Sequence, residues 1–506
     1  MRIPSQMASY AVIEEPFLEF GTASKTDEQP FTQDPQIGLL QHGPYSLQLG
    51  QPWHPPSTTL VPICADEDFD AVINALERME TFERVDDPNW YVRVDFPGYE
   101  AAYHSKLEIV QDCNGQIIPR TVWDAALGER TPREGFRILI DALTASLTAV
   151  ADSHPNATAV VFLPRDIVTQ FRTLTSDFQL AKPRKPKATT TSDARQILLF
   201  EDLFDTDDDT ETLYNDLRRA IKVRAMQKGL PLQILTDSFL NEEPSQPWAG
   251  KFWNVSCSLF CKAGGIPWRL PTAENIAHCG IRFGVSKDES GTKILVGVAQ
   301  VFSASGELVA VRTGPASKAP KRTSEAGYFL TEEQAFELVS NAIVDYESVL
   351  GRLPDRMLIH KSSSFKDVEL KGINAAKGGV REIDLVYIKG KTPLRIMPQG
   401  GQPAARGTIV PTSDDSALLY LSGFISSETS WRGKHIPSPV ELVRFQSNRS
   451  LLDLSEEVLR LTKMNWNTTV FASRHPCTFS NATEMIGMMK ELRKAETLAP
   501  QIKYYI

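Results

Sequence analysis

The sequence predicts an α/β protein with more than one domain, and three observations lead to that prediction. The first half alternates strand-like and helix-like segments, which is the pattern of an α/β domain. The second half opens with three successive strand-like segments, a long amphipathic helix and a further strand. A chain of 506 residues is too long for one compact core, so we expect two to four domains.

The composition is that of an ordinary globular protein. Hydrophobic residues make up 42% of the chain and charged residues 23%, which argues against wholesale disorder. The net charge of −9 argues against a surface coated in basic residues, so a nucleic-acid partner would need a local basic channel. The sequence shows no signal peptide and no apolar run that could span a bilayer. We therefore expect a soluble cytoplasmic protein with no membrane association.

The elements of the first half can be placed in order. Residues 1–55 are rich in Pro, Gly and Gln and are expected to form an extended leader,. A strand over residues 60–64 is followed by a run with apolar residues at helical spacing from Asp66,. A helical stretch over residues 136–150 then leads to residues 157–163, a continuous apolar strand. Such a strand is typical of a parallel sheet buried on both faces.

Two polar segments separate this strand from the next helix. Residues 181–195 are rich in Pro, Lys and Thr, and residues 201–211 are acidic. Both are interpreted as solvated segments, with a phosphate-backbone contact as the less favoured alternative for the first. One side of the following helix carries the apolar residues Leu213, Leu217, Ile221 and Ala225.

The second half has a different order of elements. Residues 281–286, 293–302 and 307–311 are expected to form three successive strands,. A helix is predicted from Thr331, which forms a capping box with Gln334,. Another short strand follows. Three antiparallel strands, a helix and a fourth strand are the opening topology of an RNase H-like domain, although other α+β folds share that order.

Common catalytic signatures fail in this sequence. Gly390, Lys391 and Thr392 imitate the end of a phosphate-binding loop, but position 385 is leucine where the first glycine is required,. Cys257 and Cys261 are four residues apart, without a second pair to complete a zinc site,. The cysteines are therefore expected to be free buried thiols.

A set of polar residues with fixed spacing gives a positive signal. Arg218 and Lys222 are four residues apart and share one helical face,. Gln233 follows at the start of an apolar stretch, and Lys262 directly precedes the segment AGGIPWRL. Two cations, an amide and a third cation would suit a terminal phosphate monoester. From the Arg218–Lys222 pair alone, a solvated helix face is the favoured reading.

The stretches LRRAIKVRAMQKGLPLQIL, CKAGGIPWRL, LPDRMLIHKSSSF and LTKMNWNTTVFASRHPCTF resemble the MID and PIWI domains of Argonaute proteins. The resemblance is strongest to the short prokaryotic Argonautes, which have only these two domains. QIGLLQHGPY and the final KYYI are also similar to that group. The resemblance implies a Rossmann-like MID domain over residues 56–262 and an RNase H-like PIWI domain over residues 263–506.

The resemblance also implies a pocket for the 5′-phosphate of a guide. Arg218, Lys222, Gln233 and Lys262 match the family's pocket residues, with Arg218 standing where many members have Tyr or His. In prokaryotic members the C-terminal carboxylate shares a divalent cation with the phosphate. Here that expectation assigns Mg²⁺ to Gln233 and Ile506,.

The nuclease positions of active PIWI domains are occupied differently in this chain. The resemblance places Arg282 in the first-strand position, Ser362 in the fourth-strand position and Thr483 in the late position. Arginine and serine cannot replace metal-binding carboxylates, so we expect a PIWI domain that does not cut. The position of the family's loop glutamate cannot be placed.

For the whole protein, the resemblance implies a sensor in prokaryotic antiviral defence. The chain would bind a 5′-phosphorylated guide RNA and recognise complementary single-stranded DNA from plasmids or phages. It would then activate an APAZ-domain partner carrying a TIR or sirtuin-like effector that depletes NAD, in a heterodimer that oligomerises on target binding. Two alternatives stay open. One is a guide-directed nuclease using relocated carboxylates such as Asp288, Glu289 or Glu484. The other is a scaffold that binds only protein.

Overall fold

The fold was obtained as a computed structural model of the whole chain. It describes residues 10–22, 30–86, 93–112, 114–171, 173–175, 214–241, 247–287, 293–315, 317–318, 328–390, 392, 394–398, 403–423, 425, 436–470, 473–493 and 496–506. The chain divides into two compact units. We call residues 19–268, 466–469 and 487–506 the parallel-sheet unit, and residues 1–18, 269–465 and 470–486 the mixed-sheet unit.

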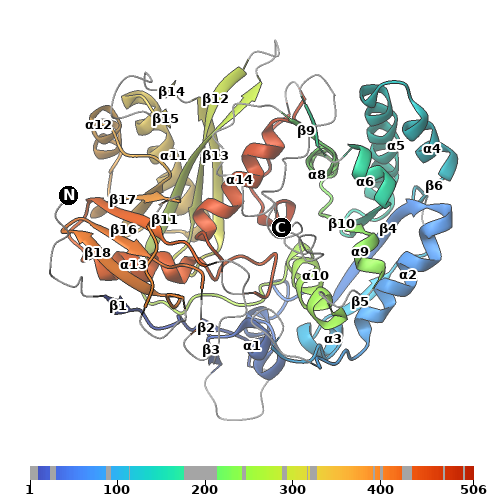
Figure 1. Cartoon of the computed structure of the whole chain (residues 1–506), viewed down its shortest axis with the longest axis horizontal. Helices are drawn as coiled ribbons and strands as arrows, with labels where there is room; N and C mark the ends of the chain where they lie inside the picture. Colours follow the sequence, from blue (N-terminus) through green and yellow to red (C-terminus); the bar gives the residue numbers. More distant parts are fainter. Residues whose placement is uncertain are drawn as a thin grey trace. The chain divides into compact units, whose positions relative to one another are not determined.

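The parallel-sheet unit is built on a sheet whose strands all run in parallel. Its strand order is β10-β7-β4-β5, with β6 also paired to β4. Figure 1 labels β4, β5, β6 and β10 of this sheet. The strands are β4 (Ser57–Ala65), β5 (Lys106–Ile109), β6 (Ile117–Ile118), β7 (Thr158–Leu163) and β10 (Leu232–Thr236). Because β7 is buried along its whole length, its continuous apolar sequence is the pattern expected of a central parallel strand,.

One face of this sheet is covered by four helices. They are α4 (Arg120–Gly128), α5 (Pro132–Ser153), α6 (Arg165–Phe171) and α8 (Leu217–Gln227). Their apolar side chains form one core with alternate residues of β4, β7 and β10, as expected where side chains alternate between the faces of a sheet. Elsewhere in the unit lie α1 (Pro35–His42), α2 (Phe69–Glu77), α3 (Tyr99–Tyr103), α9 (Asp237–Leu240) and α10 (Trp248–Lys262).

The mixed-sheet unit contains a sheet of nine strands. Their order is β1-β18-β19-β20-β17-β16-β11-β12-β13. The strands are β1 (Ala11–Val12), β11 (Ile276–Lys287), β12 (Lys293–Phe302), β13 (Leu308–Pro315), β16 (Arg356–Lys361), β17 (Glu382–Lys389), β18 (Thr408–Ser413), β19 (Ser416–Leu419) and β20 (Val440–Gln446). Strands β11, β12 and β13 are antiparallel, whereas β16 pairs in parallel with both β11 and β17.

Helices lie on both faces of the nine-stranded sheet. α11 (Glu332–Leu350) and α12 (Asp367–Ala375) pack against one face, and α13 (Leu451–Leu461) packs against the other. Phe479 of α14 (Cys477–Met489) belongs to the same core cluster as α13. Three antiparallel strands, a helix and a fourth strand parallel to the first form the predicted RNase H-like topology. The predicted fold class, a Rossmann-like domain followed by an RNase H-like domain, is confirmed.

The two units do not follow the predicted boundaries 1–55, 56–262 and 263–506. The described part of residues 1–55 is divided between the units and contains helix α1, so it is not a separate extended leader. The Tyr45 N–H donates to the Pro267 carbonyl at 3.0 Å, and the Phe20 ring lies 6.3 Å from that of Trp268. Residues 487–506 return to the parallel-sheet unit. Long-range contacts of this kind leave no periodic signal in the sequence.

Several other sequence predictions can be compared with the fold. The segments 181–195 and 201–211 lie outside the described residues. All five cysteines within the described part, Cys64, Cys257, Cys261, Cys279 and Cys477, are free and buried. None of the helices in the described ranges combines the length and apolar character needed to cross a membrane.

Candidate functional site

Helix α8 presents two of the predicted phosphate ligands. It begins after Asp216, whose side chain accepts a hydrogen bond from the Arg219 N–H at 3.1 Å and so caps the helix,. Leu217 and Ile221 are buried in the core of the parallel-sheet unit. Arg218 and Lys222 are each one position further along the helix and are half-buried. The apolar face therefore fixes which way this pair of cations is presented.

Gln233 and Lys262 are in direct contact in the structure. Leu232 and Ile234 of β10 belong to the core that includes α8, so Gln233 lies on the opposite face of that strand. The Lys262 Nζ, at the end of α10, donates to the Gln233 Oε1 at 2.8 Å. It also donates to the Ser258 Oγ at 2.7 Å, one helical turn earlier. Three residues from two elements thus meet at one ammonium group.

Lys262 is buried without a carboxylate partner among the described residues. Its side chain is 3% exposed, and it donates hydrogen bonds to a neutral amide and a neutral hydroxyl. Burial, and then the positive charge of nearby Lys222, hold the pKa of Lys262 well below the ordinary lysine range. A buried ammonium group is stable only when an anion or several acceptors compensate it. The cluster of Lys222, Gln233, Ser258 and Lys262, which we call the phosphate cluster, therefore fits an anion.

The same arrangement does not fit a cation. The Gln233 Oε1 already accepts from both Lys262 and Ser258, at 2.8 and 3.3 Å, and two lysines lie beside it. Mg²⁺ prefers several unshared oxygen ligands. Ile506 is buried in the same unit, just after the short 3₁₀ helix η4 (Ile502–Tyr504), which packs against α10. The predicted Mg²⁺ ligand pair, Gln233 and Ile506, stays a prediction that the cluster itself does not support.

The three predicted nuclease positions lie close together in the mixed-sheet unit. Arg282 is on β11, and Ser362 directly follows β16, the adjacent parallel strand. The Ser362 N–H donates to the Ile281 carbonyl at 3.2 Å, so the two positions are neighbours. The Phe479 carbonyl of α14 accepts from Arg282 Nη1 and from Thr483 Oγ1, at 3.4 and 3.3 Å. Arg282 and Thr483 thus share one acceptor, and the positive charge of Arg282 would oppose the binding of metal ions at these predicted positions,.

A second buried lysine lies next to these positions. The Lys361 Nζ donates to the Glu369 Oε2 at 2.6 Å, and both side chains are 1% exposed. Burial lowers the pKa of Lys361 to about 8, while Glu369 acts in the opposite direction. Unlike Lys262, this lysine has an anionic partner within the chain. It is part of the core and is not a candidate ligand site.

Of the three carboxylates named for the alternative nuclease, one lies within the described residues. Asp288 and Glu289 lie outside the described residues, and Glu484 is on α14. Within the ranges that the structure describes, no group of three or more His, Cys, Asp and Glu side chains is arranged to hold a metal ion.

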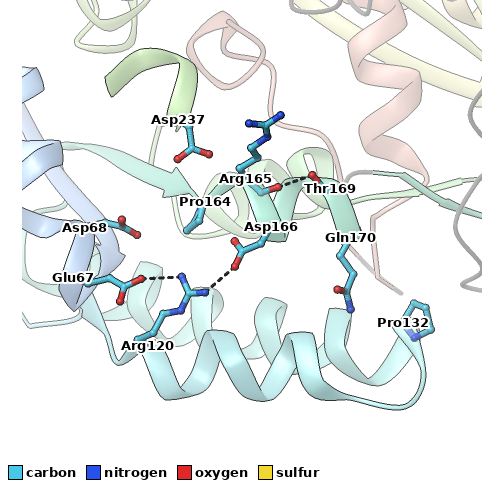
Figure 2. Close-up of a pocket in the computed structure, with 10 residues that line it drawn as sticks. All are labelled: Glu67, Asp68, Arg120, Pro132, Pro164, Arg165, Asp166, Thr169, Gln170 and Asp237. Carbon is cyan, nitrogen blue, oxygen red and sulfur yellow. Dashed lines mark hydrogen bonds and ion pairs between the residues drawn. The ribbon is translucent and has the colours of Figure 1, made fainter. Parts of the chain in front are cut away.

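The parallel-sheet unit also contains an acidic cavity of about 790 Å³. It lies where β4, β7 and β10 end, whereas Gln233 lies near the start of β10. Figure 2 shows Arg120 between Glu67 and Asp166. Its Nη1 lies 3.1 Å from Glu67 Oε1, and its Nη2 lies 2.7 Å from Asp166 Oδ2. Asp68 and Asp237 also line the cavity. Four acidic side chains outnumber the two arginines of the lining, Arg120 and Arg165, and Arg120 is already paired. The cavity therefore does not suit a phosphate.

Sequence reasoning missed one member of the phosphate cluster. Ser258 precedes Lys262 by four residues and so shares its helical face,. A serine on a helix is too common to indicate a site by itself. Only the placement of Gln233 against α10 shows that the Ser258 hydroxyl completes the lysine's set of acceptors.

Comparison with known proteins identifies the fold. No protein-family model and no curated protein sequence matches the chain. The structure of Clostridium butyricum Argonaute bound to a guide DNA and a 19-mer target DNA matches with a TM-score of 0.58 and 14% identity, covering 96% of this chain and 53% of that one. The Argonaute of A. aeolicus matches with a TM-score of 0.53 and 14% identity, covering 97% and 54%.

The chain therefore has an Argonaute-like fold and spans about half the length of the solved structures it matches. Identity at this level shows the fold alone, because one fold can support many functions.

Proposed function

We propose that this chain binds the 5′-phosphorylated end of a guide nucleic acid and does not cut the target paired with it. The observation that carries the proposal is Lys262, a buried lysine with neutral acceptors and a second lysine nearby. A 5′-phosphate would supply the missing negative charge and further acceptor oxygens. The Argonaute-like fold supports a guide nucleic acid as the source of that phosphate.

The finer parts of the proposal rest on the sequence resemblance to short prokaryotic Argonautes. They are a guide RNA, a single-stranded DNA target, and activation of an APAZ-domain partner whose effector depletes NAD. Base pairing would then read the target sequence, while the protein holds backbone and duplex shape. Mg²⁺ at the 5′-phosphate is left out of the proposed chemistry, because the cluster's own residues fit an anion.

The phosphate part is tested by measuring the affinity of guides with a 5′-phosphate and with a 5′-hydroxyl. Lys262→Met should weaken the phosphorylated guide by roughly 10- to 100-fold, since a charge-assisted hydrogen bond contributes about 1.5–3 kcal/mol. The hydroxyl guide should change little. Lys228→Met is the matched control, because Lys228 is exposed just after α8. Equal losses for both guides would contradict the phosphate cluster.

The non-cutting part has its own test. Arg282 places a positive charge where a nuclease would gather cations, which opposes metal binding. We expect a matched target to remain intact when the guide-loaded protein is incubated with Mg²⁺ or Mn²⁺. A metal-dependent cut at a defined position would favour the alternative nuclease with relocated carboxylates.

A further inference from the structure

Residues 487–506 contact α8 on the side away from its phosphate ligands. Arg224 is two residues after Lys222, which places it about 200° further around the helix. It is 6% exposed, and its guanidinium donates to both carboxylate oxygens of Glu496, at 2.7 and 2.8 Å. Arg224 Nη2 also donates to the Glu491 carbonyl at 2.8 Å. The buried arginine is therefore held by one short stretch of chain.

The same stretch follows α8 from its first turn to beyond its last. At the start, the Glu491 Oε1 accepts from the Asp216 N–H at 2.9 Å. At the end, the Gln227 Nε2 donates to the Thr497 carbonyl at 2.9 Å. Just beyond the helix, the Tyr504 hydroxyl donates to the Gly229 carbonyl at 3.2 Å. We call the described residues of this stretch, 487–493 and 496–506, the strap, because they hold the helix at both ends as well as through Arg224.

We propose that Glu496 is a positioning residue for the phosphate cluster, acting through Arg224 to fix the rotation of α8 and hence the place of Lys222. The inference rests on the proposed phosphate-binding function. A two-pronged arginine–carboxylate pair fixes direction as well as distance. The buried apolar face of α8 sets its orientation, and the two-pronged pair restrains the small rotations that such packing still allows. Misplacement of a binding group by about 1 Å can reduce an activity by about 100-fold. By fixing the position of Lys222, the strap therefore influences the affinity for the 5′-phosphate.

The experiment compares guides with and without a 5′-phosphate on full-length Glu496→Gln. This variant keeps the side-chain shape but removes the charge that holds Arg224. We expect the preference for the phosphorylated guide to fall by about tenfold, with the hydroxyl guide changed by less than about twofold. Glu83→Gln is the matched control, because it removes the carboxylate partner of Arg78 in the same unit. That control should keep the full preference.

Two further variants make the test decisive. Arg224→Lys keeps the charge but loses the two-pronged geometry, so it should show an intermediate loss of preference. A thermal unfolding curve for each variant reports folding separately. An unchanged preference in Glu496→Gln, or an equal loss for both guides, would overturn the positioning role. If Lys262→Met also keeps the preference for the phosphorylated guide, the proposed phosphate binding fails as well. If Lys262→Met loses that preference and Glu496→Gln keeps it, only the positioning role of Glu496 is rejected.

Discussion

Of the four buried lysines in the described residues, Lys262 and Lys361 differ most plainly in the partners that compensate their charge. Lys361 has Glu369 as an anionic partner, and both are sealed in the core. Lys262 has Gln233 and Ser258, which are neutral acceptors. Burial penalises the charged form of both side chains, but only Lys262 lacks a negative charge among the described residues. This difference separates a structural ion pair from a candidate site for an anionic ligand.

Binding of a phosphorylated guide should be accompanied by proton uptake at Lys262. Burial and Lys222 lower the pKa of Lys262 in the free protein, and a bound phosphate favours its charged form. Between the free and bound pKa values, affinity should therefore fall as pH rises, by up to about tenfold per pH unit. Calorimetric titrations in two buffers with different ionisation enthalpies measure the uptake. Identical heats in both buffers across a pH series would contradict it, and Lys262→Met should abolish the difference.

Removing the carboxylate of Glu369 should strongly destabilise the mixed-sheet unit. Glu369→Gln leaves the Lys361 ammonium buried without a negative charge beside it, facing a neutral amide and the Ser364 carbonyl, which accepts at 3.0 Å. Breaking one side of a buried ion pair costs about 3–5 kcal/mol. Urea unfolding followed by circular dichroism should show this loss in the free energy of unfolding. The double variant Lys361→Met/Glu369→Gln should recover part of it, and a loss below about 1 kcal/mol in the single variant would count against the burial argument.

Spacing in the sequence predicted only part of the candidate site. The interval of four residues placed Arg218 and Lys222 on one face of α8, and the structure agrees. The same polar set included Gln233 and Lys262, and the resemblance assigned both to one pocket, but neither predicted their direct contact, because they are on different elements. The Arg224–Glu496 pair could not be anticipated at all, since its partners are 272 residues apart.

At the scale of elements, the sequence predicted the features that depend on neighbouring residues, such as the start of a helix and the range of a strand. Helix α11 was predicted from Thr331, and its capping box is present: the Thr331 Oγ1 accepts from the Gln334 N–H, and the Gln334 side chain accepts from the Thr331 N–H. Strand β12 matches its predicted range. Strand β13 was predicted over residues 307–311 but extends to Pro315. Pairing with β12 continues through polar Arg312 and Thr313, which an apolar pattern does not mark.

The cap of α11 should contribute measurably to stability. Thr331→Ala removes the acceptor for the Gln334 N–H, now at 3.3 Å. Loss of such a cap costs about 1 kcal/mol. The free energy of unfolding from urea titration should fall by that amount. Thr331→Ser keeps the hydroxyl and should remain within about 0.5 kcal/mol of the original protein. A comparable loss in the serine variant would indicate that the methyl group, and not the cap, is responsible.

At the scale of the whole molecule, the chain crosses between its two units several times. The parallel-sheet unit takes residues 19–268 from the first half and residues 466–469 and 487–506 from the second. The Gln36 Nε2, for example, donates to the Thr469 Oγ1 at 3.0 Å. Boundaries drawn along the sequence assume that each domain is one continuous segment. That assumption, and not the prediction of individual strands and helices, is where the expected division fails.

The interleaved chain predicts how fragments of the parallel-sheet unit should behave. Fragments of residues 19–268 and 56–262 both lack the strap, so Arg224 loses its carboxylate partner in each. The shorter fragment also lacks α1 and the Phe20–Trp268 ring contact, so further buried apolar surface becomes exposed in it. We expect it to unfold at a lower temperature than a fragment of residues 19–268. A synthetic peptide of residues 487–506 should raise the unfolding temperature of the longer fragment, because it binds only the folded form. The same peptide with Glu496→Gln should raise it less, since the Arg224 guanidinium would then face a neutral amide. Cooperative unfolding of 56–262 at the temperature of the longer fragment, with no response to either peptide, would show that the unit folds without the returning chain.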